Sequence, residues 1–152
     1  ETNLLSGYYL TQTFKEKRFL MYDQIEKNTL TKEQIKSYDV FIVPPWIKLN
    51  EEIKIDLFVN TRSMMEMNFS TIEKYFNFIQ CHANEGAFFY NINRYYKDTV
   101  GHPIMLHEYP YDSNWDVVYS DSAWKQPWIH SLITQRKYGY FNNNIKEGIY
   151  EL

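Results

Sequence analysis

The chain has little of what would place it in several common protein classes. Its 152 residues include one cysteine, Cys81, which excludes an intramolecular disulfide and a cysteine zinc cluster and favours a cytoplasmic protein. No apolar run approaches the roughly 20 residues needed to cross a bilayer. The formal net charge is -3, whereas a protein that binds nucleic acid typically carries an excess of basic residues. We therefore expect no membrane span and no nucleic-acid partner.

Glycine is also scarce, and the start of the chain lacks a helix cap. The five glycines contain no Gly-x-Gly-x-x-Gly, so no phosphate-binding loop of that kind is present. The chain opens at Glu1, without methionine, and at once enters an apolar helical pattern at Leu4, Leu5, Tyr8 and Tyr9. We read this as a cut, with an amino-terminal segment missing. The 14 tyrosines fit either a surface that stacks on sugar-like ligands or a tyrosine-rich core.

The middle of the chain alternates apolar runs with helical patterns. Strands are predicted at 18–22, 39–43, 55–59 and 87–92, and helices at 31–36 and 68–83. Pro44 stops the run at 39–43, and Gly86 is expected to close the helix at 68–83. Continuous apolar runs predict strands buried on both faces. The alternation predicts βαβ units in a doubly wound, mostly parallel α/β sheet.

The last third of the chain departs from this alternation. Two strand-like runs, 115–122 and 129–136, follow each other with only a short turn around Pro127 between them. A short join forces antiparallel pairing, so we expect an antiparallel final strand pair. The tail, 137–152, contains Asn142, Asn143 and Asn144 and is expected to be a terminal loop.

Two segments carry a resemblance to a known family. The segment 56–67 reads DLFVNTRSMMEM, and FFYNINR follows at 88–94. In order and spacing this resembles a family of sugar O-methyltransferases, from the chain start through about Arg136. The resemblance implies the carboxy-terminal part of a Rossmann-like methyltransferase domain at 1–136, with a reversed final strand. It also implies that the amino-terminal strands that hold S-adenosylmethionine are absent.

The resemblance implies methyl transfer from S-adenosylmethionine to the hydroxyl of a small-molecule or glycan substrate. Such an in-line transfer needs alignment of donor and acceptor and a group that removes the hydroxyl proton. Glu66, His102 and His107 are the candidate catalytic residues. Glu66 can instead charge the start of the following helix, and each histidine can be structural or merely exposed.

The candidate substrate-binding residues follow the predicted strands, where open α/β sheets bind their ligands. They are Asn60, Arg62, Ser63, Asn91, Asn93, Arg94 and Tyr95. Arginine can bind a carboxylate or phosphate of an acidic sugar, or it can tie two loops together. Asparagine can bond sugar hydroxyls or end a strand through a local turn. We expect these residues to form one concave surface.

The candidate cofactor-binding residues are Pro45, Trp46, Thr61 and Met64. Trp46 can stack on adenine or pack in the interior, and Met64 can line a pocket or fill the core. The spacing of His102 and His107 matches no helical zinc motif, so no metal site is expected. The alternative to an enzyme is a non-catalytic carbohydrate-binding or assembly module on the same scaffold. Exposed strand edges left by missing strands would favour oligomers or partner binding.

Overall fold

The computed structural model describes residues 2–98 and 102–137. The predicted terminal loop, 137–152, therefore lies outside the described residues except for Lys137. The chain divides into two compact units, Glu1–Ile53 and Lys54–Leu152, and each is described by itself. Each unit has its own hydrophobic cluster, so the sequence does not build one continuous core.

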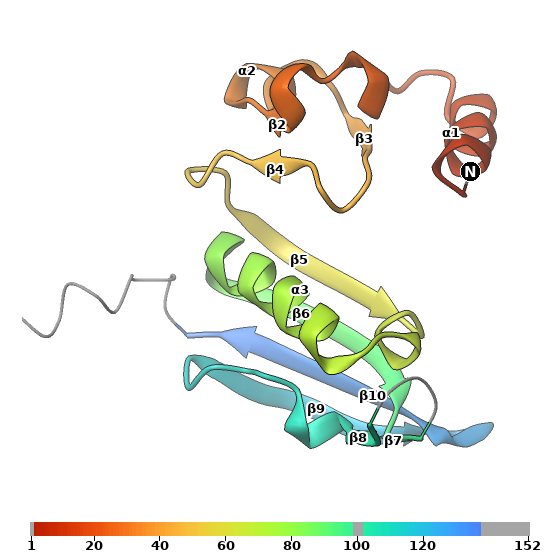
Figure 1. Ribbon diagram of the computed structural model, residues 1–152, viewed down its shortest axis with the longest axis vertical. Helices are drawn as coiled ribbons and strands as arrows, with labels where there is room; N and C mark the ends of the chain where they lie inside the picture. The colour runs from red at the N-terminus through yellow and green to blue at the C-terminus, as the bar shows by residue number, and fades with distance from the viewer. Residues whose placement is uncertain (1, 99–101, 138–152) are drawn as a thin grey trace, which may run out of the picture. The chain divides into compact units, whose positions relative to one another are not determined.

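The first unit contains two short parallel strand pairs and two helices (Figure 1). Strand β1 pairs with β3, with Phe19 opposite Val40, and β2 pairs with β4. Its elements are α1 (Thr2–Thr13), β1 (Phe19–Met21), η1 (Tyr22–Gln24), η2 (Glu26–Asn28), β2 (Thr29–Leu30), α2 (Lys32–Ser37), β3 (Val40–Ile42) and β4 (Lys48–Leu49). The apolar side chains of Leu20, Ile25, Leu30 and Ile47 form its core.

Local sequence signals explain α2. The Thr31 hydroxyl accepts a hydrogen bond from the Gln34 amide at 3.2 Å, and the Gln34 side chain accepts one from the Thr31 amide at 3.0 Å. These reciprocal bonds satisfy two backbone N–H groups that the first turn leaves unpaired. The predicted helix with Thr31 as its cap is confirmed.

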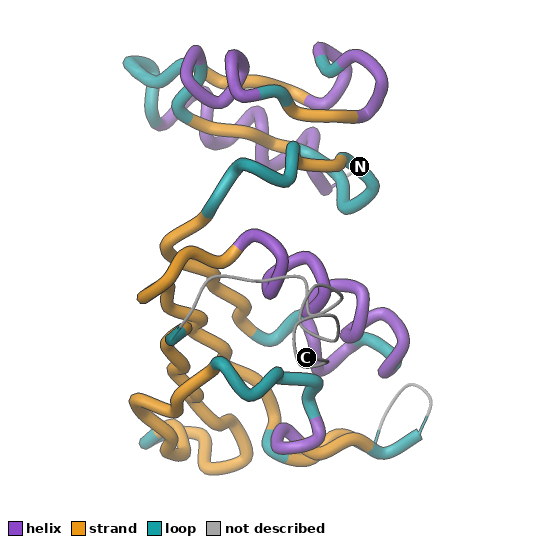
Figure 2. The backbone as a smooth tube through the Cα atoms, turned by 90° about the vertical axis from the view of Figure 1, so that its left-hand side faces the viewer, coloured by secondary structure: helices purple, strands orange, loops and turns teal. Residues whose placement is uncertain are grey.

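The second unit is a four-stranded sheet with one helix across one face (Figures 1 and 2). Its strand order is β5-β6-β10-β9. The elements are β5 (Ile55–Thr61), η3 (Met64–Glu66), α3 (Phe69–His82), β6 (Ala83–Arg94), β7 (Tyr96–Lys97), β8 (Ile104–Met105), η4 (Leu106–Glu108), β9 (Trp115–Ala123) and β10 (Gln126–Arg136).

Helix α3 forms because its apolar residues recur at helical spacing after a good cap. The Asn68 side chain accepts from the Thr71 amide at 2.9 Å, which fixes the first turn. Ile72, Phe76 and Ile79 are buried along one face. The Phe76 ring meets the Phe89 ring of β6 edge to face, with centroids 5.7 Å apart. This contact packs α3 against β6 of the sheet.

The predicted role of Gly86 in closing this helix is wrong. Helix α3 ends at His82 and β6 begins at Ala83, so Gly86 lies inside the strand. There the register against β5 jumps from Ile55 opposite Ala83 to Leu57 opposite Phe88. Gly86 has a φ of 79°, which glycine adopts without strain, so it marks a bulge in the strand.

The predicted mostly parallel, Rossmann-like α/β sheet is also wrong. The described residues are mostly strand with three α-helices, and the four-stranded sheet is mixed. Only β5 and β6 are parallel in it, because β9 and β10 join through the two residues Trp124 and Lys125 and must be antiparallel. Strand β3 pairs with β1 in a separate sheet. Between β6 and β9 the described residues form β7, β8 and η4 in place of a crossover helix.

The prediction that the strand at 55–59 is buried on both faces fails for a related reason. Phe58 faces α3 and is buried, whereas Leu57 and Val59 on the other face are exposed. In the second unit α3 covers one face of the sheet (Figure 2). An apolar run thus forms a strand with only one buried face.

Candidate functional site

The parallel pairing of β5 and β6 brings their carboxyl ends to the same end of the sheet. Asn60 lies opposite Asn91, and Thr61 lies opposite Ile92. Just beyond the last pair, the Arg62 amide donates to the Ile92 carbonyl at 2.7 Å. Arg62 and Arg94 therefore lie at one end of the sheet, as predicted. We call residues 60–67 and 93–97, which are the last residues of β5 and β6 and those that follow them, the carboxyl edge.

A network of buried amides holds the carboxyl edge together. Asn93 Nδ2 donates to Asn60 Oδ1 at 2.9 Å and also to Asn91 Oδ1. Asn93 Oδ1 accepts from the Met65 amide at 3.0 Å. Asn91 and Asn93 are both 0% exposed. These two candidate substrate-binding residues thus face the interior, where they position the turn that carries the exposed candidates.

The turn after β5 is shaped by Asn60 and Arg62. Asn60 donates to the Ser63 hydroxyl and accepts from the Met64 amide at 3.3 Å, which folds the chain back on the strand end. Arg62 has a φ of 62°, in a region that residues other than glycine seldom adopt. The Arg62 guanidinium donates to the Gln126 side chain of β10. Arg62 therefore joins the turn to the β9–β10 hairpin. This is the loop-tying role, the alternative to binding an acidic sugar.

The four candidate cofactor-binding residues are divided between the two units. Pro45 and Trp46 are exposed residues of the first unit, and Thr61 is exposed on the second. Met64 is buried in the core of the second unit, among Ile72, Phe76 and Phe89. Met64 therefore fills the core, which was the alternative to lining a cofactor pocket, and it does not fit a contact with S-adenosylmethionine.

Lys97 is a member of the carboxyl edge that the sequence did not indicate. Its side chain is 2% exposed, and Nζ donates to the Met67 carbonyl at the end of the turn after η3. Burial lowers the pKa of Lys97, and the negative charge of Glu66 opposes that shift. Glu66 itself is exposed on η3. Lysine side chains are usually solvated, so no local pattern distinguished this one in β7.

Tyr95 brings two histidines to the carboxyl edge. Its hydroxyl lies 3.4 Å from Nδ1 of His107, the candidate base carried by η4. On its other side the Tyr95 ring lies 5.7 Å from the ring of His130, whose Nε2 is 2.8 Å from the Ser120 hydroxyl. His130 was missed because it becomes a neighbour of the site only through its pairing with Asn93. His102 is exposed in a bend.

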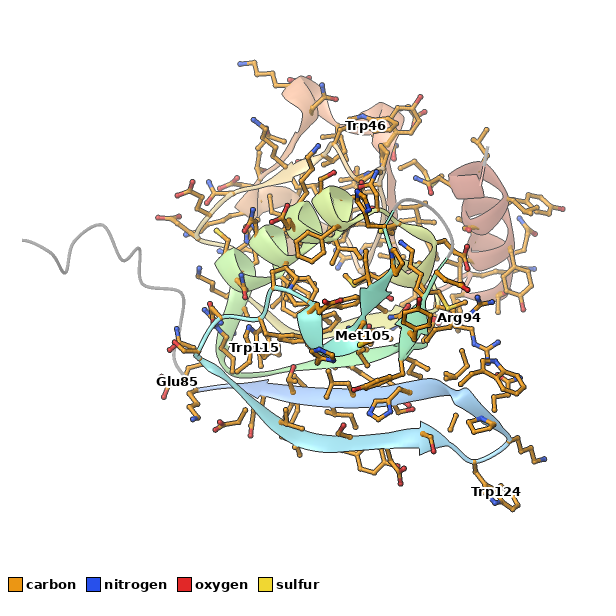
Figure 3. All side chains as sticks on the ribbon, turned by 60° about the horizontal axis from the view of Figure 1, so that its bottom comes forward. Trp46, Glu85, Arg94, Met105, Trp115 and Trp124 are labelled. Atoms are coloured by element: carbon orange, nitrogen blue, oxygen red, sulfur yellow. The ribbon has the colours of Figure 1, made fainter. Side chains whose placement is uncertain are left out.

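The β9–β10 hairpin carries two exposed tryptophans at the same end of the sheet. Trp124 lies in the turn and is 93% exposed, and Trp128 is 60% exposed. The Tyr95 amide donates to the Trp128 carbonyl at 3.3 Å. Figure 3 shows Trp124 at the end of the sheet that holds Arg94, whereas Trp115 and Glu85 lie at the opposite end. Exposed aromatic faces of this kind are typical of ligand contacts.

Two findings on the described residues concern metal ions and membranes. No three histidine, cysteine, aspartate or glutamate side chains within 2–98 and 102–137 gather closely enough to hold a metal ion. Within the same ranges, no helix is both long and apolar enough to span a membrane. The exposed side chains of the carboxyl edge include those of Arg62, Ser63, Glu66 and Tyr95. No protein-family model, no curated protein and no solved structure matches the chain.

Proposed function

We propose that the chain forms the acceptor side of a sugar O-methyltransferase, with the sugar bound at the carboxyl edge. One observation carries the proposal: the two segments that resemble the family, 56–67 and 88–94, lie on the adjacent parallel strands β5 and β6 and on the turn after β5, and both strands end at one edge. The Asn93–Asn60 bond of 2.9 Å and the Arg62–Ile92 bond of 2.7 Å join these segments directly.

The exposed groups of the carboxyl edge supply what an acceptor hydroxyl needs. Ser63 presents a hydroxyl group from the turn after β5, and Arg94 presents a guanidinium at the end of β6. Glu66 or His107 accepts the proton that the hydroxyl loses as the methyl group arrives. The buried amides of Asn91 and Asn93 keep these groups in fixed positions.

The proposal assigns no cofactor contact to the described residues. S-adenosylmethionine supplies the methyl group in the family that the chain resembles.

A second candidate function is a non-catalytic carbohydrate-binding module. The exposed Trp124 and Trp128 favour it, because aromatic faces bind sugar rings without any donor site. In this case Glu66 and His107 bind hydroxyl groups and transfer no proton.

A coupled assay separates the two candidates. The protein, as its gene encodes it, is incubated with S-adenosylmethionine and a panel of glucose, galactose, glucuronic acid and their nucleotide-linked forms, and S-adenosylhomocysteine release is measured. The enzyme proposal predicts release with at least one sugar, and a loss on the order of a hundredfold in turnover for Glu66→Gln or for His107→Ala. Sugar binding by calorimetry without any release supports the binding module. If no sugar of the panel binds and none causes release, both candidate functions are refuted.

A further inference from the structure

The four-stranded sheet of the second unit has two edges of unequal character. Its strand order is β5-β6-β10-β9, so β5 and β9 are the outermost strands (Figure 1). Within the ranges that the structure describes, no strand pairs with the outer side of either one. An edge strand offers a row of backbone N–H and C=O groups to any other strand, and proteins usually protect such edges from pairing.

Strand β9 carries two known forms of edge protection. Its register against β10 shifts between Tyr119 and Val117, which leaves Val118 as the extra residue of a bulge. Asp116 and Asp121 add negative charges along the strand. A bulge twists an edge away from flat pairing, and charged side chains oppose the approach of another strand. The β9 edge is therefore protected.

Strand β5 has neither form of protection. Over 57–61 it pairs with β6 residue by residue, because the bulge at Gly86 lies in β6. The residues of this stretch carry no charge, and Leu57 and Val59 are each 58% exposed. The seven residues of β5 make an edge about 23 Å long. This edge is regular, apolar and long enough to pair with another strand.

The hydrogen bonds of β5 to β6 show which backbone groups are open at the outer edge. The Arg62 amide donates to the Ile92 carbonyl at 2.7 Å, so the even-numbered residues direct their N–H and C=O groups toward β6. Successive residues of a strand direct these groups to alternate sides. Leu57 and Val59 therefore direct theirs toward the outer edge.

We infer that the outer edge of β5 pairs with β5 of a second copy of the chain, antiparallel and about a twofold axis at Phe58. In this register Leu57 lies opposite Val59 of the second copy, and Val59 lies opposite its Leu57. Both pairs join residues whose backbone groups face the edge, so each pair exchanges two hydrogen bonds. The two sheets then form one continuous sheet of eight strands. This inference does not depend on the proposed function.

The apolar side chains of β5 match themselves in this register, as a twofold interface requires. Leu57 and Val59 lie on the face of the sheet opposite α3, and both are on the same face. Their pairing across the axis places one apolar side chain against another twice. Within the chain, Val59 already pairs with Tyr90 of β6, so the new pairs extend an existing row of large side chains.

The charges of β5 also permit this register. Asp56 lies opposite Asn60 of the second copy, so no like charges meet within the paired strands. Lys54, just before the strand, lies opposite Arg62, just after it. The side chains of both are held on their own copy: Lys54 Nζ donates to the Cys81 carbonyl at 2.7 Å, and Arg62 donates to the β9–β10 hairpin.

Sedimentation equilibrium of the full chain measures the assembly, since the dimer has twice the monomer mass of 18.5 kDa. An interface of one strand pair is small, so we expect dimers at about 100 µM and monomers below about 1 µM. Val59→Lys places a charge at the edge and should raise the dissociation constant at least about tenfold. Val117→Lys, at a valine that is 64% exposed on β9, is the matched control and should leave the constant unchanged.

Hydrogen exchange locates the contact. The amides of Leu57 and Val59 should exchange more slowly in the dimer than in the monomer. A monomer at every concentration overturns the inference, and so does a dimer that Val117→Lys disrupts and Val59→Lys leaves intact. Slow exchange of these two amides in the monomer would show that the chain itself covers the edge, which also overturns it. Circular dichroism checks the fold of each variant, and Leu57→Lys tests the same contact if Val59→Lys does not fold.

Discussion

The side chain of Asn93 donates to Asn60 Oδ1 at 2.9 Å and so joins the ends of β5 and β6. Asn93 Oδ1 in turn accepts from the Met65 amide at 3.0 Å. One buried side chain thus fixes both the strand end and the turn that carries Arg62 and Glu66. The geometry of the candidate site depends on this interior amide as much as on the exposed groups.

Replacing Asn93 by alanine should destabilise the second unit and loosen the carboxyl edge. The substitution leaves the buried Met65 amide without its acceptor, and one unsatisfied buried group costs about 1–3 kcal/mol. Urea unfolding followed by circular dichroism measures the change. Asn84→Ala on the same strand is the control, because Asn84 bonds Asp56 at an exposed position and should cost less than about 1 kcal/mol. Equal losses in the two variants would contradict the role given to Asn93.

Stability should fall in alkaline solution because two tyrosines are buried. Burial raises the pKa of Tyr109 to about 12 and raises that of Tyr111 well above its usual range. The unfolded chain loses these protons near the ordinary tyrosine value of about 10, so the folded form holds them more tightly. The contribution of the two buried tyrosines to the free energy of unfolding is complete below about pH 10 and is lost as the pH rises toward 12.

Unfolding in urea at pH values on either side of 10 tests this dependence. Tyr109→Phe should make the alkaline fall shallower, because phenylalanine has no proton to lose. Lys97 has the opposite effect on the pH dependence of stability. Because its pKa is lowered in the folded protein, the free energy of unfolding rises with pH up to about 10.4, the ordinary lysine value. Lys97→Met should therefore steepen the net alkaline fall. An identical pH profile for all three proteins would show that these groups are solvated in the fold.

Arg136 and Asp112 should respond unequally to substitution. Arg136 Nη1 lies 2.6 Å from Asp112 Oδ1, with side chains 0% and 31% exposed. Among the described residues, no acceptor bonds Arg136 Nε or Nη2. Asp112→Ala leaves a buried guanidinium uncompensated and should cost about 3–5 kcal/mol. Arg136→Met keeps the volume and leaves a carboxylate that water can reach, so it should cost less. Denaturant midpoints of the two variants measure the difference, and a larger loss for Arg136→Met would reverse this interpretation.

S-adenosylmethionine should not bind this chain with useful affinity. Met64, one of the predicted contacts, is buried in the core of the second unit and cannot line a cofactor pocket. A site whose parts are not preorganised loses further binding free energy to ordering. Calorimetric titration measures this directly. Micromolar binding with one-to-one stoichiometry would show that other described residues form the site.

Local signals in the sequence predicted some elements well, whereas features that depend on long-range strand pairing were not predicted. The caps Thr31 and Asn68 and the apolar spacing of α3 are local, so both helices were predicted close to their observed ends. The partner of β3 and the bulge at Gly86 depend on strands distant in the chain. For the site, the strand ends indicated Arg62 and Arg94. The burial of Asn91, Asn93 and Lys97 arises only when α3 and the following loops pack, so the sequence could not show it.

The most direct test of the sugar site is to map binding residue by residue. Proton–nitrogen correlation spectra of the protein are recorded during titration with glucose, galactose and glucuronic acid. For at least one of these sugars we predict the largest shifts at the amides of Arg62, Ser63, Arg94, Tyr95 and His107. Glu85 and Trp115 lie at the opposite end of the sheet (Figure 3), and Arg136 pairs with Trp115, so the amides of these three residues should not move. Shifts largest at that opposite end, or no shift with any of the three sugars, would contradict the assignment of the carboxyl edge as the acceptor site.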